Sequence, residues 1–191
     1  MSATVVVATR DHASALADLF RACESACFCR YWHFDGDKNA WLERCALSPE
    51  KNEAEMRDDL ARDAPRARGL VALDEARAVG WMKLAPRDAL PKLRARRDLR
   101  ALDLGDDDRV LSIGCMLVRP DARGRGVARD LVVAGVAHAE RVRARAIEAY
   151  PHAARDLGPH EVWMGPCALF ASLGFKHVTG DPIYPVMRLA L

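Results

Sequence analysis

The stretch that decides the fold lies at residues 118–128, which read V-R-P-D-A-R-G-R-G-V-A. It follows an apolar, strand-like run over residues 110–118 and precedes a long helical pattern rich in Ala, Val and Leu. A glycine-rich turn between a strand and a helix exposes backbone N–H groups that have no partner within the helix. The helix dipole adds partial positive charge at the same point, so the turn predicts an anion site. Arg123 and Arg125 supply two guanidinium groups that suit phosphate oxygens.

The turn differs from two common phosphate-binding motifs. No G-K-[ST] follows the glycines, which excludes a P-loop. Arg129 stands where the dinucleotide fingerprint needs a third glycine or alanine. Two other interpretations stay open, namely a plain strand–turn–helix connection that uses glycine for steric reasons and a phosphate binder of another kind.

The same residues resemble the acyl-CoA signature of the GNAT superfamily of N-acyltransferases, [QR]-x-x-G-x-[GA], which reads R-G-R-G-V-A at residues 123–128. The upstream extension V-x-P-x-x-R-G-x-G is also present, with Val118 and Pro120 in place. Residues 168–175, A-L-F-A-S-L-G-F, are similar to the family's A-x-x-x-Y-x-x-x-G-F ending, and the closing Y-P-V-M-R-L at 184–189 looks like other members.

Hydrophobic periodicity predicts an alternation of strands and helices along the whole chain. The expected strands cover residues 4–9, 69–73, 78–85, 110–118, 146–150, 175–178 and 187–191. The expected helices cover residues 11–23, 39–63 with a break at Ser48-Pro49, 127–145, and a short segment opened by Gly165-Pro166. Residues 86–108 form an insertion. The order β-α-α-β-β-β-α-β-α-β-β is that of the GNAT fold, an α/β fold with a mixed sheet, and we predict one domain over residues 1–191.

Composition sets outer bounds on the function. Half of the 191 residues are hydrophobic, 29% are charged and the net charge is +2, so no polyanionic partner is required. We interpret the basic residues of the insertion (Arg87, Lys92, Arg94, Arg96, Arg97 and Arg100) as a solvated face and expect no nucleic-acid binding. The sequence shows neither an 18-residue apolar run nor a signal peptide, which predicts a cytoplasmic protein without a membrane segment.

Six cysteines are spread through the chain, and in a cytoplasmic protein they are expected to be reduced thiols. Cys23, Cys27 and Cys29 form C-x3-C-x-C, but no second ligand pair follows at a suitable spacing. We therefore expect no metal site.

The resemblance implies that acetyl-CoA is the cosubstrate and places it on named residues. The fourth strand of the family splays from the fifth, so the backbone of Leu117 and Val118 would pair with the pantetheine amides. A backbone N–H at Met116 or Leu117 would polarise the thioester carbonyl. The pyrophosphate would lie on the turn, whose residues are Arg123, Gly124, Arg125, Gly126, Val127 and Ala128. Phe170 takes the position where the family often has a tyrosine that protonates the CoA sulfur.

The catalytic groups are left unassigned. The fourth strand lacks the glutamate that some members use as a base, and Phe170 cannot act as an acid. His33, Cys115 and Tyr150 are candidates, each with a structural alternative as a packed or inert side chain. Tyr31, Trp32 and His33 are suited to line an acceptor site or, alternatively, to close the core beneath the first helices.

The resulting hypothesis is an N-acetyltransferase that moves an acetyl group from acetyl-CoA to a primary amine of a small molecule or peptide by direct attack in a ternary complex. The alternative is a non-catalytic acetyl-CoA-binding sensor or a degenerate GNAT protein, which the missing tyrosine and glutamate favour. The resemblance also implies that a homodimer is one of the assemblies to test.

Overall fold

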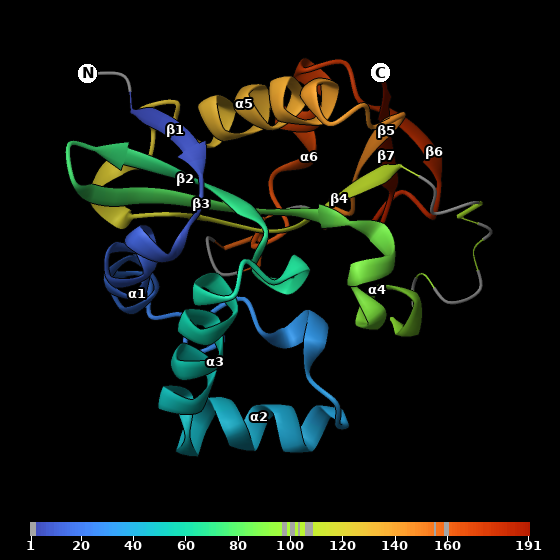
Figure 1. The fold of residues 1–191 in the computed structure, drawn as a ribbon. Helices are drawn as coiled ribbons and strands as arrows, with labels where there is room; N and C mark the ends of the chain where they lie inside the picture. The colour runs from blue at the N-terminus through green and yellow to red at the C-terminus, as the bar shows by residue number, and fades with distance from the viewer. Residues whose placement is uncertain are drawn as a thin grey trace.

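A mixed sheet of seven strands runs through the part of the chain that the structure describes. This computed structural model describes residues 3–96, 99, 102, 104–105, 109–154, 156–158 and 161–191. Helices cover both faces of the sheet (Figure 1), which confirms the predicted fold class. No helix formed by the described residues is long and apolar enough to cross a membrane.

The strands lie in the spatial order β1-β2-β3-β4-β5-β7-β6. Among the described strands, β4 and β5 form the one parallel pair, and every other neighbouring pair is antiparallel. The bounds are β1 Thr4–Val7, β2 Gly69–Asp74, β3 Arg77–Pro86, β4 Val110–Val118, β5 Ala146–Ala149, β6 Lys176–Thr179 and β7 Val186–Ala190.

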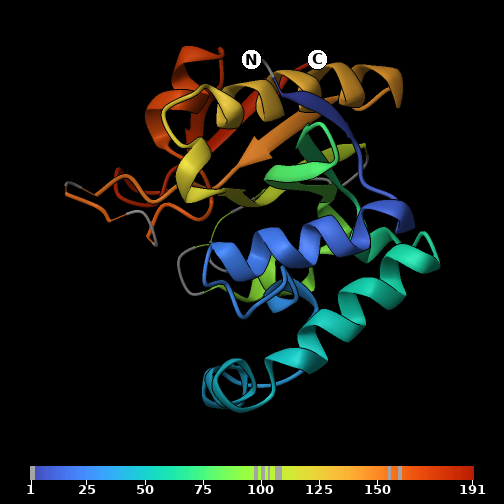
Figure 2. The same ribbon diagram turned by 90° about the vertical axis from the view of Figure 1, so that its left-hand side faces the viewer.

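The helices are divided between the two faces (Figures 1 and 2). Four lie on one side, namely α1 Ala13–Ala22, α2 Lys38–Leu47, α3 Pro49–Ala61 and the short α4 Pro91–Ala95. The other side carries α5 Val127–Arg141 and α6 Cys167–Ser172. Single 3-10 turns cover Arg10–His12, Tyr31–His33, Pro65–Ala67, Arg87–Ala89 and Pro120–Ala122.

Each face of the sheet has its own apolar core. Leu16, Phe20 and Trp81 are buried in the core beneath α1, whereas Ile113 and Leu131 are buried in the core beneath α5. Side chains alternate between the two faces of a strand, so β4 contributes to both cores. Burial of each large apolar side chain is worth about 1.5–3 kcal/mol.

The structure adds the short α4 within the insertion to the predicted element order, and the other differences lie at element ends. Pro49 is at the first position of α3, so the predicted break separates two helices. The long helix ends at Arg141, four residues before the predicted end, because Val142 is already outside the helical geometry and half exposed. The first strand ends at Val7 rather than residue 9.

Candidate active site

The second half of β4 lacks a strand partner on its β5 side. Pairing between β4 and β5 runs from Val110 opposite Ala146 to Ile113 opposite Ala149, where β5 ends. The register with β3 shifts between Lys83 and Leu84, which leaves Gly114 as an extra residue in β4. Beyond this bulge, β4 continues to Val118 beside β3 alone among the strands.

Backbone alternation decides which groups of β4 face the open side. Arg119 N–H donates to the Val79 carbonyl of β3 at 2.9 Å. Because hydrogen-bonded pairs in an antiparallel ladder recur every second residue, Leu117 also directs its N–H and C=O toward β3. Met116 and Val118 therefore present their backbone groups to the open side. The backbone of Leu117 thus points to β3, so the expected backbone contact with a ligand is favoured for Met116 and Val118 rather than for Leu117.

The glycine-rich turn has the geometry that the sequence predicts. Gly124 and Gly126 have φ values of 75° and 86°, in the left-handed region that favours glycine. A Cβ built on either glycine has no heavy atom within 4 Å, so the space in front of both is open. Gly126 is the N-cap of α5, whose first N–H groups have no intrahelical partner. The helix dipole favours an anion at this point.

The charges around the turn also favour an anion. Arg123 is exposed, and its Nε donates to the Val118 carbonyl at 3.2 Å, which ties the turn to the end of β4. The one acid in the stretch, Asp121, is paired with Arg77 at 2.6 Å. The Arg77 hydrogen bond lowers the pKa of the Asp121 carboxyl below its usual value. The carboxylate thus has its own cation, which leaves the guanidinium of Arg123 for a ligand.

A cavity of about 660 Å³ joins the open edge of β4 to the turn. Of the ten residues predicted to bind the cosubstrate, eight line it: Met116, Leu117, Val118, Arg123, Gly124, Gly126, Val127 and Ala128. The other walls come from Cys23, Glu24, Ser25, Ala122, Arg129, Leu157, Val162, Trp163, Gly165, Pro166 and Leu169. One of these walls is formed by Val162, Trp163, Gly165, Pro166 and Leu169, and the Gly165-Pro166 pair before the G-F ending is the sequence signal that indicates it. The wall formed by Cys23, Glu24 and Ser25 after α1 has no such signal in the sequence.

The remaining two predicted residues do not line this cavity. Arg125 is exposed on the turn. Phe170 is fully buried, and its ring packs at a tilt against Phe175, with 5.4 Å between the ring centroids. A Cβ on Gly165 would lie 2.6 Å from the Phe170 ring, so the ring sits directly beneath the cavity wall.

The open side of β4 is contacted by the chain that returns toward α6. Met116 N–H donates to the Trp163 carbonyl at 2.7 Å. The Trp163 ring packs on Trp32 and Tyr31, with centroid distances of 5.7 and 6.2 Å. Trp163 therefore accepts from Met116, one of the two backbone donors that the family resemblance implies for the thioester carbonyl.

The aromatic residues of the first long loop divide into two roles. Trp32 is buried, and its Nε1–H donates to the Gly114 carbonyl at the β4 bulge, at 2.8 Å. Tyr31 is partly exposed and meets the Trp32, Trp41 and Trp163 rings edge-on. Trp32 thus closes the core, and Tyr31 borders it. Neither residue lines the large cavity.

His33 lies apart from the large cavity, in a polar cleft of about 390 Å³ beside Arg30, Asp59 and Arg66. Burial first, and then the charges of Lys83, Arg30 and Arg66, lower the pKa of His33 to about 3. Its Nε2 is buried and has no hydrogen-bond partner among the described residues. A neutral imidazole with so low a pKa is a weak base, so the geometry does not support His33 as the general base.

The depressed pKa of His33 predicts a loss of stability in acid. The unfolded chain binds a proton at His33 below pH 6.5, whereas the native protein binds it only near pH 3. Native stability therefore decreases as the pH falls from about 6.5 toward 3. We expect this slope to be shallower in His33→Gln. Urea unfolding of both proteins at pH 7 and pH 5 measures the difference, and equal slopes would contradict the prediction.

Cys115 lies on the face of β4 opposite Met116, in the core beneath α1. It is 2% exposed and shares a hydrogen bond with the Cys29 thiol, close to the buried Lys83. That hydrogen bond and burial raise the pKa of Cys115 well above its usual value. A buried, protonated thiol is inert. The structure therefore places Cys115 away from the cavity.

Tyr150 is buried in a polar network rather than at the cavity. Its hydroxyl donates to Glu148 Oε2 at 2.6 Å and contacts Ser112 Oγ at 2.9 Å. Burial and the neighbouring Glu148 carboxylate raise the pKa of Tyr150 well above its usual value. All three catalytic candidates thus lie outside the large cavity.

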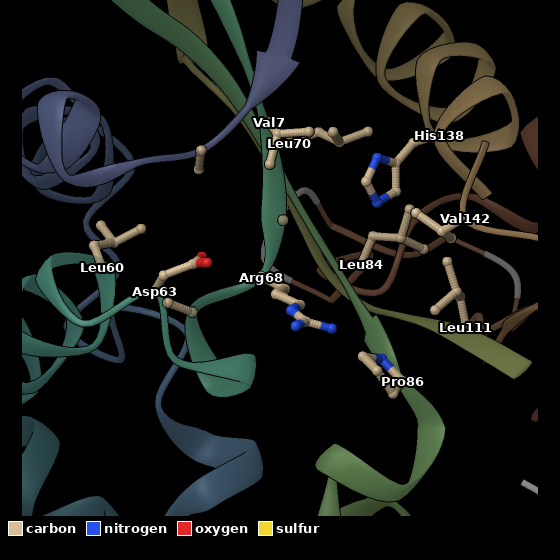
Figure 3. A pocket seen from close by; sticks show the side chains of 13 residues that line it. Val7, Leu60, Asp63, Arg68, Leu70, Leu84, Pro86, Leu111, His138 and Val142 are labelled. Atoms are coloured by element: carbon tan, nitrogen blue, oxygen red, sulfur yellow. The ribbon is translucent and has the colours of Figure 1, made fainter. Parts of the chain in front are cut away.

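A second cavity, of about 240 Å³, lies between the end of α3 and the last turns of α5. Figure 3 shows the side chains of Arg68 and His138 beside the apolar Leu84 and Val142. None of the predicted site residues lines it. Of the two, only the cavity on β4 combines a turn for anions with an open strand edge.

Residues 37–162 match the model of the acetyltransferase (GNAT) family, which is more than half of the chain and includes β4 and the turn. No curated protein sequence gives a significant match.

Solved structures with the same fold span nearly the whole chain. A GCN5-related N-acetyltransferase from Kribbella flavida has 22% identity and a TM-score of 0.58, and the match covers 100% of this chain and 98% of that one. The PaiA N-acetyltransferase of Thermoplasma acidophilum, in complex with coenzyme A, has 9% identity, a TM-score of 0.58 and coverage of 98% and 99%. A phosphinothricin acetyltransferase from Sinorhizobium meliloti, in complex with acetyl-CoA, has 19% identity, a TM-score of 0.55 and coverage of 100% and 89%.

Proposed function

The chain belongs to the acetyltransferase (GNAT) family and is an acyltransferase, and on this premise we propose that it transfers an acetyl group from acetyl-CoA to a primary amine by direct attack in a ternary complex. The single observation that carries the proposal is the cavity that joins the open edge of β4 to the N-terminus of α5. A strand edge suits the amides of pantetheine, and a helix N-terminus suits a pyrophosphate.

The residues present fit acetyl-CoA as a substrate. We assign the pyrophosphate to the N–H groups at the start of α5, with Arg123 as a counter-charge and the open space before Gly124 and Gly126 as room for the oxygens. We assign the pantetheine amides to the outward backbone of Met116 and Val118. The coenzyme A and acetyl-CoA complexes of the fold neighbours support this choice of ligand.

Catalysis in this proposal rests on positioning and on one backbone donor. Holding the thioester beside the amine makes the reaction effectively unimolecular. The Met116 N–H points to the open side of β4, where it can donate to the developing oxyanion. Because His33, Cys115 and Tyr150 all lie outside the cavity, we propose that the amine arrives as the free base. The CoA thiol, with a pKa of about 8.5, can leave as the thiolate without an acid.

Phe170→Tyr tests whether this position reaches the reacting sulfur. The ring is fully buried against Phe175 and below Gly165, so a hydroxyl there would be enclosed. We expect the pH profile of turnover to keep its shape, while an unsatisfied hydroxyl lowers stability by about 1–3 kcal/mol. The measurements are initial rates between pH 6 and pH 10 and urea unfolding. A new acidic or basic limb would show that Phe170 faces the sulfur.

The acceptor is assigned only by class, as a primary amine of a small molecule or a peptide. A screen of amines with acetyl-CoA, in which release of the CoA thiol is followed and the product is weighed by mass spectrometry, tests this class. Thiol release that requires a particular amine would support the proposal. Release that is equal with and without every amine would contradict it.

A second function is favoured by one observation. Phe170 stands where the family often has a tyrosine, and its ring is fully buried beneath the cavity wall without lining the cavity. A protein that binds acetyl-CoA without transferring the acetyl group would explain this arrangement. It predicts binding of acetyl-CoA in calorimetry together with no thiol release across the amine panel.

A further inference from the structure

The chain returns to the open edge of β4 through a tight turn at residues 162–165, which we call the Trp163 turn. The Gly165 N–H donates to the Val162 carbonyl at 2.8 Å and closes it. Gly165 has a φ of 90°, and a Cβ on it would lie 2.7 Å from Met116 Sδ. The turn is therefore pressed against Met116 through both backbone and side chain.

Two further contacts hold the turn in place. The Trp163 ring packs between Trp32 and Tyr31, and Trp32 is itself fixed by its hydrogen bond to the Gly114 carbonyl. On the cavity side, Val162, Trp163 and Gly165 form part of the wall. The turn is thus connected to the β4 bulge through Trp32, and it borders the space assigned to the pantetheine arm.

One backbone donor serves two acceptors in this geometry. The Met116 N–H already donates to the Trp163 carbonyl at 2.7 Å. A second carbonyl oxygen could share this hydrogen only in a bifurcated bond, in which both contacts are weaker. A thioester carbonyl that takes the full hydrogen bond of Met116 therefore displaces the Trp163 carbonyl.

We propose that the Trp163 turn is a gate for the acyl group, and that the thioester carbonyl of acyl-CoA takes the Met116 N–H in exchange for the Trp163 carbonyl. This inference rests on the proposed function. It makes Trp163 a positioning residue: its ring keeps the turn on β4, and its carbonyl covers the oxyanion donor until a thioester arrives. The exchange keeps the buried N–H paired at each stage, which avoids the penalty of an unsatisfied donor.

The exchange predicts that only ligands with a thioester carbonyl move the turn. The chain has six methionines, among them Met116 at the donor and Met164 within the turn, so ¹⁵N-methionine labelling gives a simple spectrum. Met116→Leu and Met164→Leu assign the two peaks. Acetyl-CoA is compared with S-ethyl-CoA, a thioether that has the same chain without the carbonyl. Calorimetry on the same samples reports binding of both.

We expect both ligands to bind, and acetyl-CoA alone to move the Met164 peak. A Met164 shift with both ligands would show that bulk moves the turn rather than carbonyl exchange, and a shift with neither would show that the Trp163 bond persists. Either result overturns the inference but leaves the proposed function intact. Absence of binding in calorimetry would instead overturn the proposed function itself.

A second measurement tests the anchoring by the Trp163 ring. Trp163→Ala removes the contacts with Trp32 and Tyr31, so we expect hydrogen exchange at the Met116 amide to become about tenfold faster. Trp41→Ala is the matched control, because Trp41 packs on Tyr31 and Phe34 without contacting the turn. Equal exchange rates at Met116 in the two variants would contradict the anchoring role.

Discussion

Gly126→Glu is expected to abolish binding of acetyl-CoA while the protein stays folded. Gly126 has a φ of 86° and caps α5, and the space in front of it is open. The new side chain would therefore enter the region assigned to the pyrophosphate, where its carboxylate would take the helix N–H groups and repel the phosphates. Loss of even one charge-assisted hydrogen bond costs about 1.5–3 kcal/mol. With repulsion added, we expect at least about 100-fold weaker binding.

Gly126→Ala is the matched control for this variant. A side chain at positive φ costs roughly 1–2 kcal/mol of backbone strain in either case. Both variants should therefore lose similar stability in urea, and only the glutamate should remove binding in calorimetry. An unchanged affinity in Gly126→Glu would contradict the site. Equal losses of affinity in the two variants would mean that strain, rather than charge, explains the effect.

The sequence predicts the turn and the element order because both depend on local signals. A β-branched run, a proline, two glycines and an amphipathic helix follow one another within residues 110–141, and each is decided by its immediate neighbours. The wall at Trp163 is different. Trp163 lies 47 residues beyond Met116, and the two meet only because β5 ends early and the chain folds back to β4.

A sequence indicates catalytic candidates only by chemical type, and burial decides against the three in this chain. His33, Cys115 and Tyr150 carry groups that transfer protons in other enzymes, and no periodicity indicates which face of the sheet each occupies. The bulge at Gly114 sets this for β4, since it places both Ile113 and Met116 on the α5 face and leaves Cys115 on the α1 face. A bulge changes strand phase without a reliable signature in one sequence.

Arg87 shows the same limit for charged residues. It belongs to the basic run interpreted as a solvated face, of which Arg97 and Arg100 lie outside the described residues. For Arg87 that interpretation is wrong, because it is 2% exposed and donates to Glu148 Oε2 at 2.9 Å. It also donates to the carbonyls of Leu104 and Gly105. A guanidinium that pairs across 61 residues cannot be distinguished, in sequence, from one in water.

The buried pair fastens the insertion to the centre of the sheet. Glu148 lies on β5 between β4 and β7, and its carboxylate also accepts from Arg188 of β7 and from Tyr150. Through Arg87 the same carboxylate is connected to the 3-10 turn that follows β3. The network therefore joins four segments next to the point where β4 and β5 separate, and Tyr150 has a structural role within it.

Arg87→Met is consequently expected to be the most destabilising single change, because it leaves the Glu148 carboxylate buried with one of its two cations removed. Breaking a buried ion pair costs about 3–5 kcal/mol, and since Arg188 remains we expect about 3 kcal/mol in urea unfolding. The control is Arg62→Met, whose arginine is 70% exposed in its pair with Asp58 and should cost less than about 1 kcal/mol.

Adding Glu148→Gln to Arg87→Met should recover part of the loss, because the amide is neutral and needs no buried counter-charge. The folded fraction of Arg87→Met should bind acetyl-CoA with unchanged affinity, since neither Arg87 nor Glu148 lines the cavity on β4. Similar unfolding energies for Arg87→Met and Arg62→Met would show that the network contributes little to stability. A loss of affinity without a loss of stability would instead connect the network to the substrate site, although neither Arg87 nor Glu148 lines that cavity.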